Sequence, residues 1–415
     1  MLKPILLQDD ICRIARSAET AQMGVARLEA LAETKLIDYN GDKSRYVFFG
    51  AGKARRELEE DFKTNPISLY GRTMKESDYE RYLGDFLGQS LEESVTKTIS
   101  QRIGKATQSV YQIKAVLEDP RSSLIGSLFA GITIFEVSVI PFLLYNSSCW
   151  FSIRRKDIQR LERFQNLFFT MIFNVQKSPY CSFYWDTKTL TMENRILKNK
   201  LLFLFHVLNL PKTSKAYLVL QEQRRLELPG LWKETEEFLT ERMVTNLDKF
   251  TKKSWKQFID EEISSKNEFE LKKIMRTKTK IVAGEILEEE YCVKEYLKNM
   301  TVERARTKYR ERYYMLKYCK KNFFNDKIFQ KDGYKCSFCP AISSQNHLKV
   351  CWRYENIRHS YNLEDENDAV DYLIEVIKLN QKVDEEGDNE SEFFEEESVF
   401  GLEGSPARNG EERES

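Results

Sequence analysis

The chain has 415 residues, of which 41% are hydrophobic and 12% aromatic, so it can bury a sizeable core in two or three domains. Its net charge is zero, but residues 381–415 carry 13 acidic and 3 basic side chains, which leaves residues 1–380 at +10. A basic body suits nucleic acid, although a soluble protein with an acidic tail would show the same balance. The eight cysteines are scattered, with one compact cluster, rather than regularly spaced as in a disulfide scaffold. The sequence also shows no signal peptide at its start, so both features argue against a secreted, disulfide-rich protein. We expect a reducing compartment, the nucleus or the cytoplasm.

Two adjacent carboxylates, Asp9 and Asp10, follow the apolar residues 4–7. An apolar strand that enters a tight turn predicts a buried hairpin. Adjacent carboxylates there cannot both be buried without partners, and hard oxygen ligands of this kind suit Mg²⁺. The other interpretation is that Asp9 and Asp10 are ordinary turn residues.

Further elements follow in a regular order. The sequence predicts an amphipathic helix over residues 17–35 with Ser17 as its N-cap, then a turn that holds Lys43. A strand over 46–49 and a second, charged helix over 52–63 come next. Residues 67–70 and the tripeptide Tyr82-Leu83-Gly84 then suggest a further hairpin.

This order resembles the closing half of the reverse transcriptase palm in the non-LTR (LINE-type) retrotransposon family. In that family a metal-binding Asp-Asp turn is followed by a helix, a strand-turn with a lysine, and a Tyr-Leu-Gly hairpin near the primer. The resemblance implies a Mg²⁺ cofactor, catalytic roles for Asp9, Asp10 and Lys43, and primer or template contacts by Tyr82, Leu83 and Gly84. The chain departs from the family at Leu7 and Gln8, where an aromatic and a small residue are usual.

The family also uses a metal-binding Asp on an earlier strand, and upstream segments that hold template and nucleotide. These 415 residues do not contain them. Two metals clamp the attacking and leaving oxygens in phosphoryl transfer, so a missing shared carboxylate removes both charge stabilisation and positioning. We therefore expect that the chain alone does not polymerise DNA, and that primer extension on an RNA template gives no Asp9-dependent product.

Residues 92–118 form the clearest predicted helix, because apolar residues recur every three or four positions from Val95 to Leu117. Pro120 ends it. Its outer face is expected to carry four basic residues: Lys97, Arg102, Lys105 and Lys114. In the resembled family this region is the thumb that grips the template duplex, which implies primer or template contacts by the first three. A solvated helix face would show the same pattern.

Residues 124–145 contain one charged side chain, Glu136, and are long enough to span a membrane. A charge at mid-depth is costly in lipid, so we expect a buried helix pair and no membrane partner, with an anchor as the lesser alternative. Helices are predicted over 156–175 and 193–208, and His206 is expected in the core. Leu-Leu-Tyr-Asn at 143–146 and Arg-Phe-Gln at 163–165 extend the family resemblance.

Residues 231–324 are charged and helical in pattern, with a sparse apolar side. Residues 272–280 and 307–321 are basic, and tyrosines interleave the second run: Tyr309, Tyr313, Tyr314 and Tyr318. Basic residues that neutralise phosphates, with aromatic rings free to stack on bases, are typical of single-strand binding. Charged helical linkers carry the same residues for solubility.

Four metal-binding residues lie within one short segment: Cys336, Cys339, His347 and Cys351. They can close a tetrahedral shell around Zn²⁺, and a closed shell predicts a structural site. A short helix would place His347 and Cys351 on one face, because they are four residues apart. The alternative is four unlinked residues. Many non-LTR reverse transcriptases carry a Cys-Cys-His-Cys cluster downstream of the thumb, so this match adds to the resemblance.

The predicted fold is α+β at the N-terminus, a partial reverse transcriptase palm, and otherwise predominantly α-helical, with a small zinc module and a disordered acidic tail. The expected domains are the partial palm at 1–90, the helical thumb and connection at 91–230, a charged helical linker at 231–325, the zinc module at 326–380 and the tail at 381–415. The implied function is a fragment of an RNA-directed DNA polymerase that binds an RNA template and a DNA primer or target, with no small-molecule substrate. The alternative is a non-catalytic, zinc-dependent nucleic-acid-binding or interaction protein.

Overall fold

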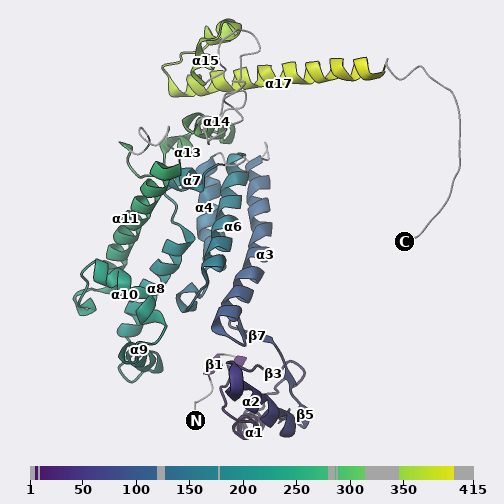
Figure 1. Cartoon of the computed structure of the whole chain (residues 1–415), viewed down its shortest axis with the longest axis vertical. Helices are drawn as coiled ribbons and strands as arrows, with labels where there is room; N and C mark the ends of the chain where they lie inside the picture. Colours follow the sequence, from purple (N-terminus) through teal and green to yellow (C-terminus); the bar gives the residue numbers. More distant parts are fainter. Residues whose placement is uncertain are drawn as a thin grey trace, which may run out of the picture. The chain divides into compact units, whose positions relative to one another are not determined.

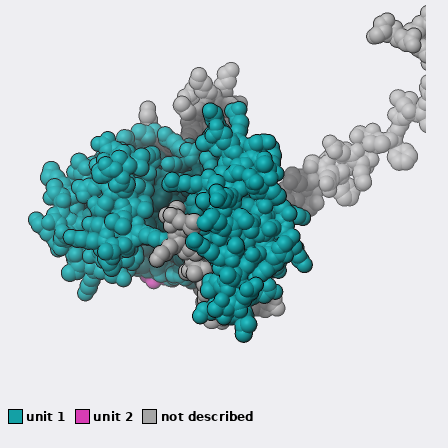
Figure 2. All heavy atoms as spheres, turned by 90° about the horizontal axis from the view of Figure 1, so that it is seen from below, with its two compact units in different colours: residues 1–298 teal, residues 299–415 magenta. Residues whose placement is uncertain are grey.

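The computed structural model describes residues 5–7, 10–118, 127–175, 178–278, 286, 288–313 and 345–396. The chain falls into two compact units, residues 1–298 and 299–415, which Figure 2 distinguishes by colour. Helices dominate both units, and the described strands form four two-stranded sheets in unit 1. The mainly helical character predicted from the sequence is confirmed.

The N-terminal elements follow the predicted order. Strands β1 (Ile5–Leu7) and β2 (Asp10–Cys12) form an antiparallel hairpin in which Leu7 faces Asp10. Helix α1 (Ala18–Lys35) begins at Ser17, whose side chain accepts a hydrogen bond from Thr20 N in a capping box. Helix α2 (Gly52–Thr64) corresponds to the second predicted helix.

The strand predicted over 46–49 is shorter than expected. Strand β3 (Arg45–Tyr46) pairs in parallel with β6 (Lys75–Glu76). Beyond it the chain leaves the sheet, because Phe48 packs edge-on against Phe62 of α2 with ring centroids 5.0 Å apart. An aromatic contact with a helix thus replaces further strand pairing.

Two tight hairpins follow where the sequence suggested one. Strands β4 (Ser68–Leu69) and β5 (Arg72–Thr73) form the first, and β7 (Tyr79–Tyr82) and β8 (Asp85–Gly88) form the second. Strand β8 lies on α3 (Leu91–Glu118), where Ser94 Oγ accepts a hydrogen bond from Gly88 N at 2.8 Å and Thr98 Oγ1 accepts one from Phe86 N at 2.9 Å. Helix hydroxyls therefore satisfy the outer backbone N–H groups of this edge strand.

Residues 128–143 form one continuous helical run, which corrects the predicted helix pair. It consists of α4 (Leu128–Ile134), a π-helical turn η1 (Phe135–Val139) and α5 (Ile140–Leu143). Pro141 has no N–H for the regular ladder, and a π turn accommodates its absence. Glu136 pairs with Arg195 at 2.5 Å, so its charge is compensated within the protein. No helix in the described part of the chain is long and apolar enough to cross a membrane.

Helices α3, α4 and α6 (Arg155–Phe173) run side by side in unit 1 (Figure 1). Helices α7 (Tyr180–Thr187) and α8 (Met192–Leu208) complete this part, with a short 3₁₀ turn η2 (Ser147–Cys149) against α8. The helices predicted over 156–175 and 193–208 are confirmed. The expectation for His206 is wrong, because its side chain is exposed while Phe205 and Val207 take the buried positions of the last turn.

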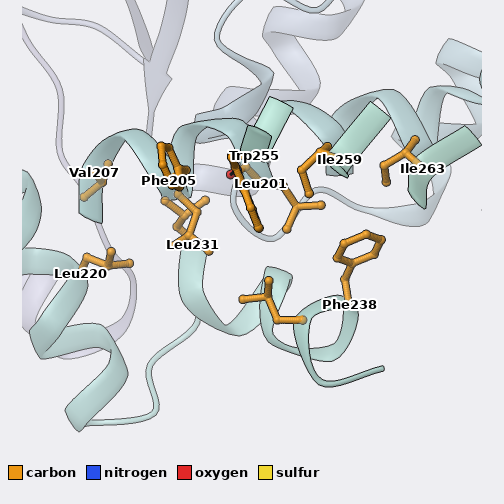
Figure 3. Packing of buried hydrophobic residues seen from close by; sticks show 11 residues of the cluster. Leu201, Phe205, Val207, Leu220, Leu231, Phe238, Trp255, Ile259 and Ile263 are labelled. Carbon is orange, nitrogen blue, oxygen red and sulfur yellow. Dashed lines mark hydrogen bonds between the residues drawn. The ribbon is translucent and has the colours of Figure 1, made fainter. Parts of the chain in front are cut away.

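The segment predicted as a charged linker contributes to a hydrophobic core instead. Its helices α10 (Leu231–Glu241) and α11 (Lys252–Lys278) pack on α8, with the 3₁₀ turn η3 (Leu247–Lys249) between them. Helix α9 (Lys215–Arg225), which precedes this segment, packs on α8 as well. Figure 3 shows Trp255 of α11 against Phe205 of α8, and their rings stack at 5.5 Å. Trp255 is 1% exposed and its indole N–H donates to Leu201 O at 3.1 Å. The few large apolar residues of this segment are thus sufficient to bury one side of α10 and α11 in a core shared with α8.

Unit 2 has its own small core. Its described elements are α14 (Val302–Arg312), α15 (Gln345–Val350), η4 (Trp352–Tyr354), α16 (Glu355–Arg358) and α17 (Glu366–Glu396), and α13 (Glu295–Asn299) lies at the boundary of the units. Tyr309 and Tyr313 are 0% and 2% exposed, so they are not free to stack on bases as expected; Tyr314 and Tyr318 lie outside the described residues. Helix α17 continues to Glu396, which corrects the disorder predicted for 381–396; residues 397–415 lie outside the described part.

Candidate nucleic-acid interface

The Tyr-Leu-Gly motif forms the tip of the β7–β8 hairpin. Tyr82 pairs with Asp85, and the two residues between them, Leu83 and Gly84, have φ angles of 49° and 86°. Positive φ at both central positions is the mark of a type I′ turn, whose twist matches that of the flanking strands. The hairpin predicted from this tripeptide is therefore present, with Leu83 and Gly84 at its tip.

Arg102 does not lie on the outer face of α3, and this corrects its predicted position. It is 4% exposed, and its Nη2 donates to Gly84 O at 3.1 Å and to Asp85 Oδ1 at 2.5 Å. Its Nη1 donates to Tyr145 O. Burial lowers the pKa of Arg102, and the nearby Asp85 carboxylate opposes that effect. The guanidinium is a bridge inside the protein rather than a surface ligand for phosphate.

Asp85, which directly follows the Tyr-Leu-Gly motif, was missed by the sequence reasoning. Its Oδ2 accepts a hydrogen bond from Asn146 Nδ2 at 3.0 Å while Oδ1 pairs with Arg102. The rings of Tyr145 and Trp150 each lie with their centroid 5.5 Å from the Arg102 Cζ. One hydrogen-bond network around Arg102 thus joins the hairpin tip, α3 and the turn after α5.

Lys97 and Lys105 are exposed on α3, as predicted. Lys97 Nζ lies over the rings of Tyr79 and Phe86 in the hairpin, 5.3 Å and 5.9 Å from their centroids. Among the side chains that the structure describes, no carboxylate pairs with either lysine. Lys114, in contrast, lies 3.8 Å from Glu118. The two lysines nearest the hairpin therefore retain uncompensated positive charge.

The same face of α3 carries no acidic residue. Between Glu93 and Glu118 the helix has no Asp or Glu. Its exposed residues in this interval are polar, basic, small or aromatic, with one aliphatic exception, Val116: Lys97, Gly104, Lys105, Gln108, Tyr111, Gln112, Ala115 and Val116. At Gly104 a built Cβ would meet no atom within 4 Å, so packing in unit 1 does not require this glycine. We call this set the α3 face.

The residues expected to be catalytic are not brought together by the described part of the structure. Lys43 lies in a turn, where its backbone N donates to Asn40 O at 3.2 Å, and its exposed side chain makes no ion pair with a described residue. Asp10 begins strand β2, and Asp9 lies outside the described residues. Their catalytic roles and the Mg²⁺ site stay predictions from the resemblance.

Two of the four predicted zinc ligands are described. His347 lies in α15, and Cys351 is the first residue beyond that helix, with extended backbone angles; its N donates to His347 O at 2.8 Å and closes the last turn. Cys351 is 2% exposed, and its carbonyl accepts a hydrogen bond from Arg358 Nη2 at 2.5 Å. Cys336 and Cys339 lie outside the described residues. Within residues 345–396 and the other described ranges, no group of three or more His, Cys, Asp or Glu residues could hold a metal.

The donor chemistry of this pair fits zinc, since an imidazole and a thiolate are its preferred ligands. Helix α15, which carries His347 and ends directly before Cys351, is held in the core of unit 2, where Tyr372 OH donates to Leu348 O at 2.6 Å. Lys349, between the two ligands, pairs with Glu311 of α14 at 3.0 Å. Half of the predicted ligand set therefore has a fixed backbone position.

Comparison with known proteins identifies no relative: no protein family, no curated protein and no solved structure matches the chain.

Proposed function

We propose that the chain is a nucleic-acid-binding portion of a non-LTR retrotransposon RNA-directed DNA polymerase. It binds an RNA template paired with a DNA primer or target along the α3 face, next to the tip of the β7–β8 hairpin. The observation that carries the proposal is the α3 face itself, where Lys97 and Lys105 pair with no carboxylate of the described residues and no acid lies between Glu93 and Glu118.

Electrostatics favours phosphate over other partners for this face. The chain contains 65 acidic residues among 415, so a long helix segment without any of them departs from the rest of the sequence. Carboxylates would repel a phosphate backbone, whereas lysines neutralise phosphates and release their counterions. Exposed amides such as those of Gln108 and Gln112 can donate to phosphate and sugar oxygens.

The hairpin tip adds a preformed element to this surface. Arg102 fixes Gly84 and Asp85 against α3, and Lys97 covers the aromatic side of the same hairpin. A surface that is rigid before binding loses less conformational entropy when the ligand arrives. The proposal for these 415 residues is binding; the Mg²⁺ site implied by Asp9 and Asp10 belongs to the resemblance.

We propose further that Cys336, Cys339, His347 and Cys351 hold one structural Zn²⁺. A zinc ion with four protein ligands stabilises a fold that a small hydrophobic core supports weakly on its own. Support comes from the described pair, His347 in α15 and Cys351 directly after that helix. The role of the metal would be to fix the 326–380 segment, with no open position for chemistry.

The binding proposal is tested by fluorescence anisotropy with a fluorescein-labelled RNA–DNA primer-template, titrated with the full chain at several salt concentrations. The variant is Lys97→Ala/Lys105→Ala, and the matched control is Lys212→Ala/Lys215→Ala, two exposed lysines, one just before α9 and one at its first residue. We expect the first variant to weaken binding for all sequences and to reduce the salt slope by about 2, one per lost phosphate contact. Equal loss in the control, or a flat salt response of the wild type, would contradict the proposal.

The second candidate, a zinc-dependent nucleic-acid-binding or interaction protein without polymerase ancestry, shares the zinc ligands and differs at the β1–β2 hairpin. Mg²⁺ should tighten primer-template binding if Asp9 and Asp10 are a metal-binding pair. Loss of that effect in Asp9→Asn favours the polymerase. Binding that is independent of Mg²⁺ in both proteins favours the second candidate.

A further inference from the structure

Tyr145 borders the hairpin tip, although it comes from a different part of the chain. It follows α5, its side chain is 53% exposed, and a Cβ built at Gly84 would lie 3.5 Å from its Cε1. Gly84 has a φ of 86°, a conformation that favours glycine. At Gly84 the hairpin tip therefore consists of backbone atoms alone, and the ring of Tyr145 lies directly beside them.

Hydrogen bonds and a cation–π contact fix the position of Tyr145. Tyr145 O accepts a hydrogen bond from Arg102, and the Arg102 Cζ lies 5.5 Å from the ring centroid. The next residue, Asn146, donates to Asp85 Oδ2 at 3.0 Å. Tyr145 is thus an aromatic residue whose carbonyl and following residue are both held by hydrogen bonds, with a ring that is about half exposed to solvent.

We infer that the ring of Tyr145 is a stacking platform for a nucleobase of the strand that lies along the hairpin tip. The inference rests on the proposed function, because the α3 face would hold the phosphates of that strand. Aromatic rings stack on any base, which suits a protein that binds nucleic acid without reading its sequence.

The charges around Tyr145 favour a nucleic acid strand over an apolar protein segment. Both oxygens of Asp85, the acid at the hairpin tip, are engaged by Arg102 and Asn146, so its charge is compensated. Lys97 and Lys105 lie on α3, where no carboxylate from the described ranges of the chain pairs with them. Tyr145 supplies an exposed ring for stacking, and α3, whose Arg102 contacts that ring, also carries Lys97 and Lys105 for phosphate neutralisation. Stacking and phosphate neutralisation are the two parts of a single-strand contact.

A purely structural role is the competing explanation. The ring could serve only to shield the Arg102–Asp85 pair from water, because it covers the guanidinium. In that case loss of the ring would lower the stability of the fold and leave the affinity of the folded protein unchanged. The two roles therefore differ in what Tyr145 substitutions do to binding.

The test compares Tyr145→Ala, Tyr145→Leu and Tyr145→Phe in the full chain, with Phe269→Ala as control at a 69% exposed aromatic position on α11. Affinity is measured with the fluorescein-labelled RNA–DNA primer-template carrying a single-stranded template overhang, and thermal unfolding is followed by circular dichroism. We expect Tyr145→Ala and Tyr145→Leu to bind roughly 5- to 100-fold more weakly, the range for one lost base stack. Tyr145→Phe, which keeps the ring, should stay within about twofold of wild type, and Phe269→Ala should bind as wild type.

Tyr145→Leu keeps apolar bulk over Arg102, so it separates stacking from shielding even if the alanine variant unfolds. Photo-crosslinking of the wild type with a 5-iodouridine-substituted template should link a base to the peptide that contains Tyr145. Wild-type affinity in Tyr145→Leu, or equal losses in Tyr145→Phe and Tyr145→Leu, would overturn the stacking inference while the Lys97 and Lys105 result stands. Failure of the wild type to bind in a salt-dependent way would overturn the proposed function, and the stacking inference with it.

Discussion

Arg102 and Asp85 form an ion pair in which Nη2 lies 2.5 Å from Oδ1, and this pair joins α3 to the β7–β8 hairpin. The side chains are 4% and 22% exposed. Desolvation of the guanidinium lowers the pKa of Arg102, while Asp85 acts in the opposite direction. Arg102 also donates hydrogen bonds to Gly84 O and Tyr145 O. Its removal would therefore break the link between α3, the hairpin tip and the turn after α5.

Arg102→Ala should lower the free energy of unfolding by about 3–5 kcal/mol, because it leaves Asp85 partly buried without its partner. Urea unfolding followed by circular dichroism measures this. The control is Lys53→Ala, which breaks an exposed pair with Glu57 at 3.5 Å and should change stability by less than about 0.5 kcal/mol. Equal effects of the two substitutions would show that the buried bridge contributes little.

Gly104→Ala should raise the stability of the fold and lower its affinity for nucleic acid. The substitution adds about 0.5–1 kcal/mol to the stability of a helix interior, and nothing lies within 4 Å of the new Cβ. On the proposed interface the methyl group should obstruct close approach of the nucleic acid and weaken binding severalfold. Thermal unfolding and primer-template anisotropy measure the two effects.

Gly131→Ala is the matched control for Gly104, since a Cβ there would lie 2.7 Å from Leu117 Cδ1. It should destabilise the protein through overpacking, typically by about 1–3 kcal/mol, and leave the affinity of the folded protein unchanged. If Gly104→Ala stabilises the chain and binds as wild type, the nucleic acid does not approach α3 at this position.

Glu162 should give the stability curve a recognisable pH dependence. Burial raises the pKa of Glu162, although hydrogen bonds from Tyr184 OH at 2.8 Å and Met192 N at 2.5 Å oppose the effect. The folded state therefore binds this proton more tightly than the unfolded state, and ionisation destabilises the fold. The stability advantage of wild type over Glu162→Gln should fall as the pH rises from the ordinary glutamate value of about 4.3 through the raised pKa.

Urea unfolding of wild type, Glu162→Gln and Glu222→Gln between about pH 3 and pH 8 measures this difference, because a raised pKa acts above the ordinary glutamate value of about 4.3 and a lowered pKa acts below it. Glu222 provides a control of opposite sign, because a hydrogen bond from Arg225 lowers its pKa. The contribution of Glu222 to the free energy of unfolding is present above its unfolded pKa and is lost as the pH falls through its folded pKa. The stability of wild type relative to Glu222→Gln should therefore increase as the pH rises. A difference for Glu162→Gln that stays constant with pH would contradict the burial effect.

Local patterns in the sequence were enough to predict the elements but not their partners. The helix at α1 has its N-cap at Ser17, and α3 follows from a regular apolar period, both of which are local signals. Arg102 looked like a surface residue because its partners, Asp85 and Tyr145, come from elsewhere in the chain. Burial of a charged side chain depends on such distant partners, which no local period encodes.

The same reason explains the tyrosines of α14 and the segment predicted as a linker. Tyr309 and Tyr313 lie in a strongly basic stretch, yet both are buried in unit 2, where α14 packs on α17 from much later in the sequence. Trp255 belongs to a sparse apolar side that gains its partners from α8. Charge content indicated solvent exposure in both cases, whereas the few large apolar residues decided the packing.

The zinc proposal predicts one Zn²⁺ per chain, measured by native mass spectrometry of the full chain purified without chelator. Cys336→Ser should abolish this stoichiometry, because a shell that loses one thiolate holds the metal far more weakly. Cys149→Ser, at an exposed cysteine of unit 1, is the control and should retain the metal. Chelation should lower the thermal stability of the wild type and leave that of Cys336→Ser unchanged, since only the wild type has a metal to lose. Zinc-free wild-type protein, or full occupancy in Cys336→Ser, would show that His347 and Cys351 lie one turn apart for packing alone.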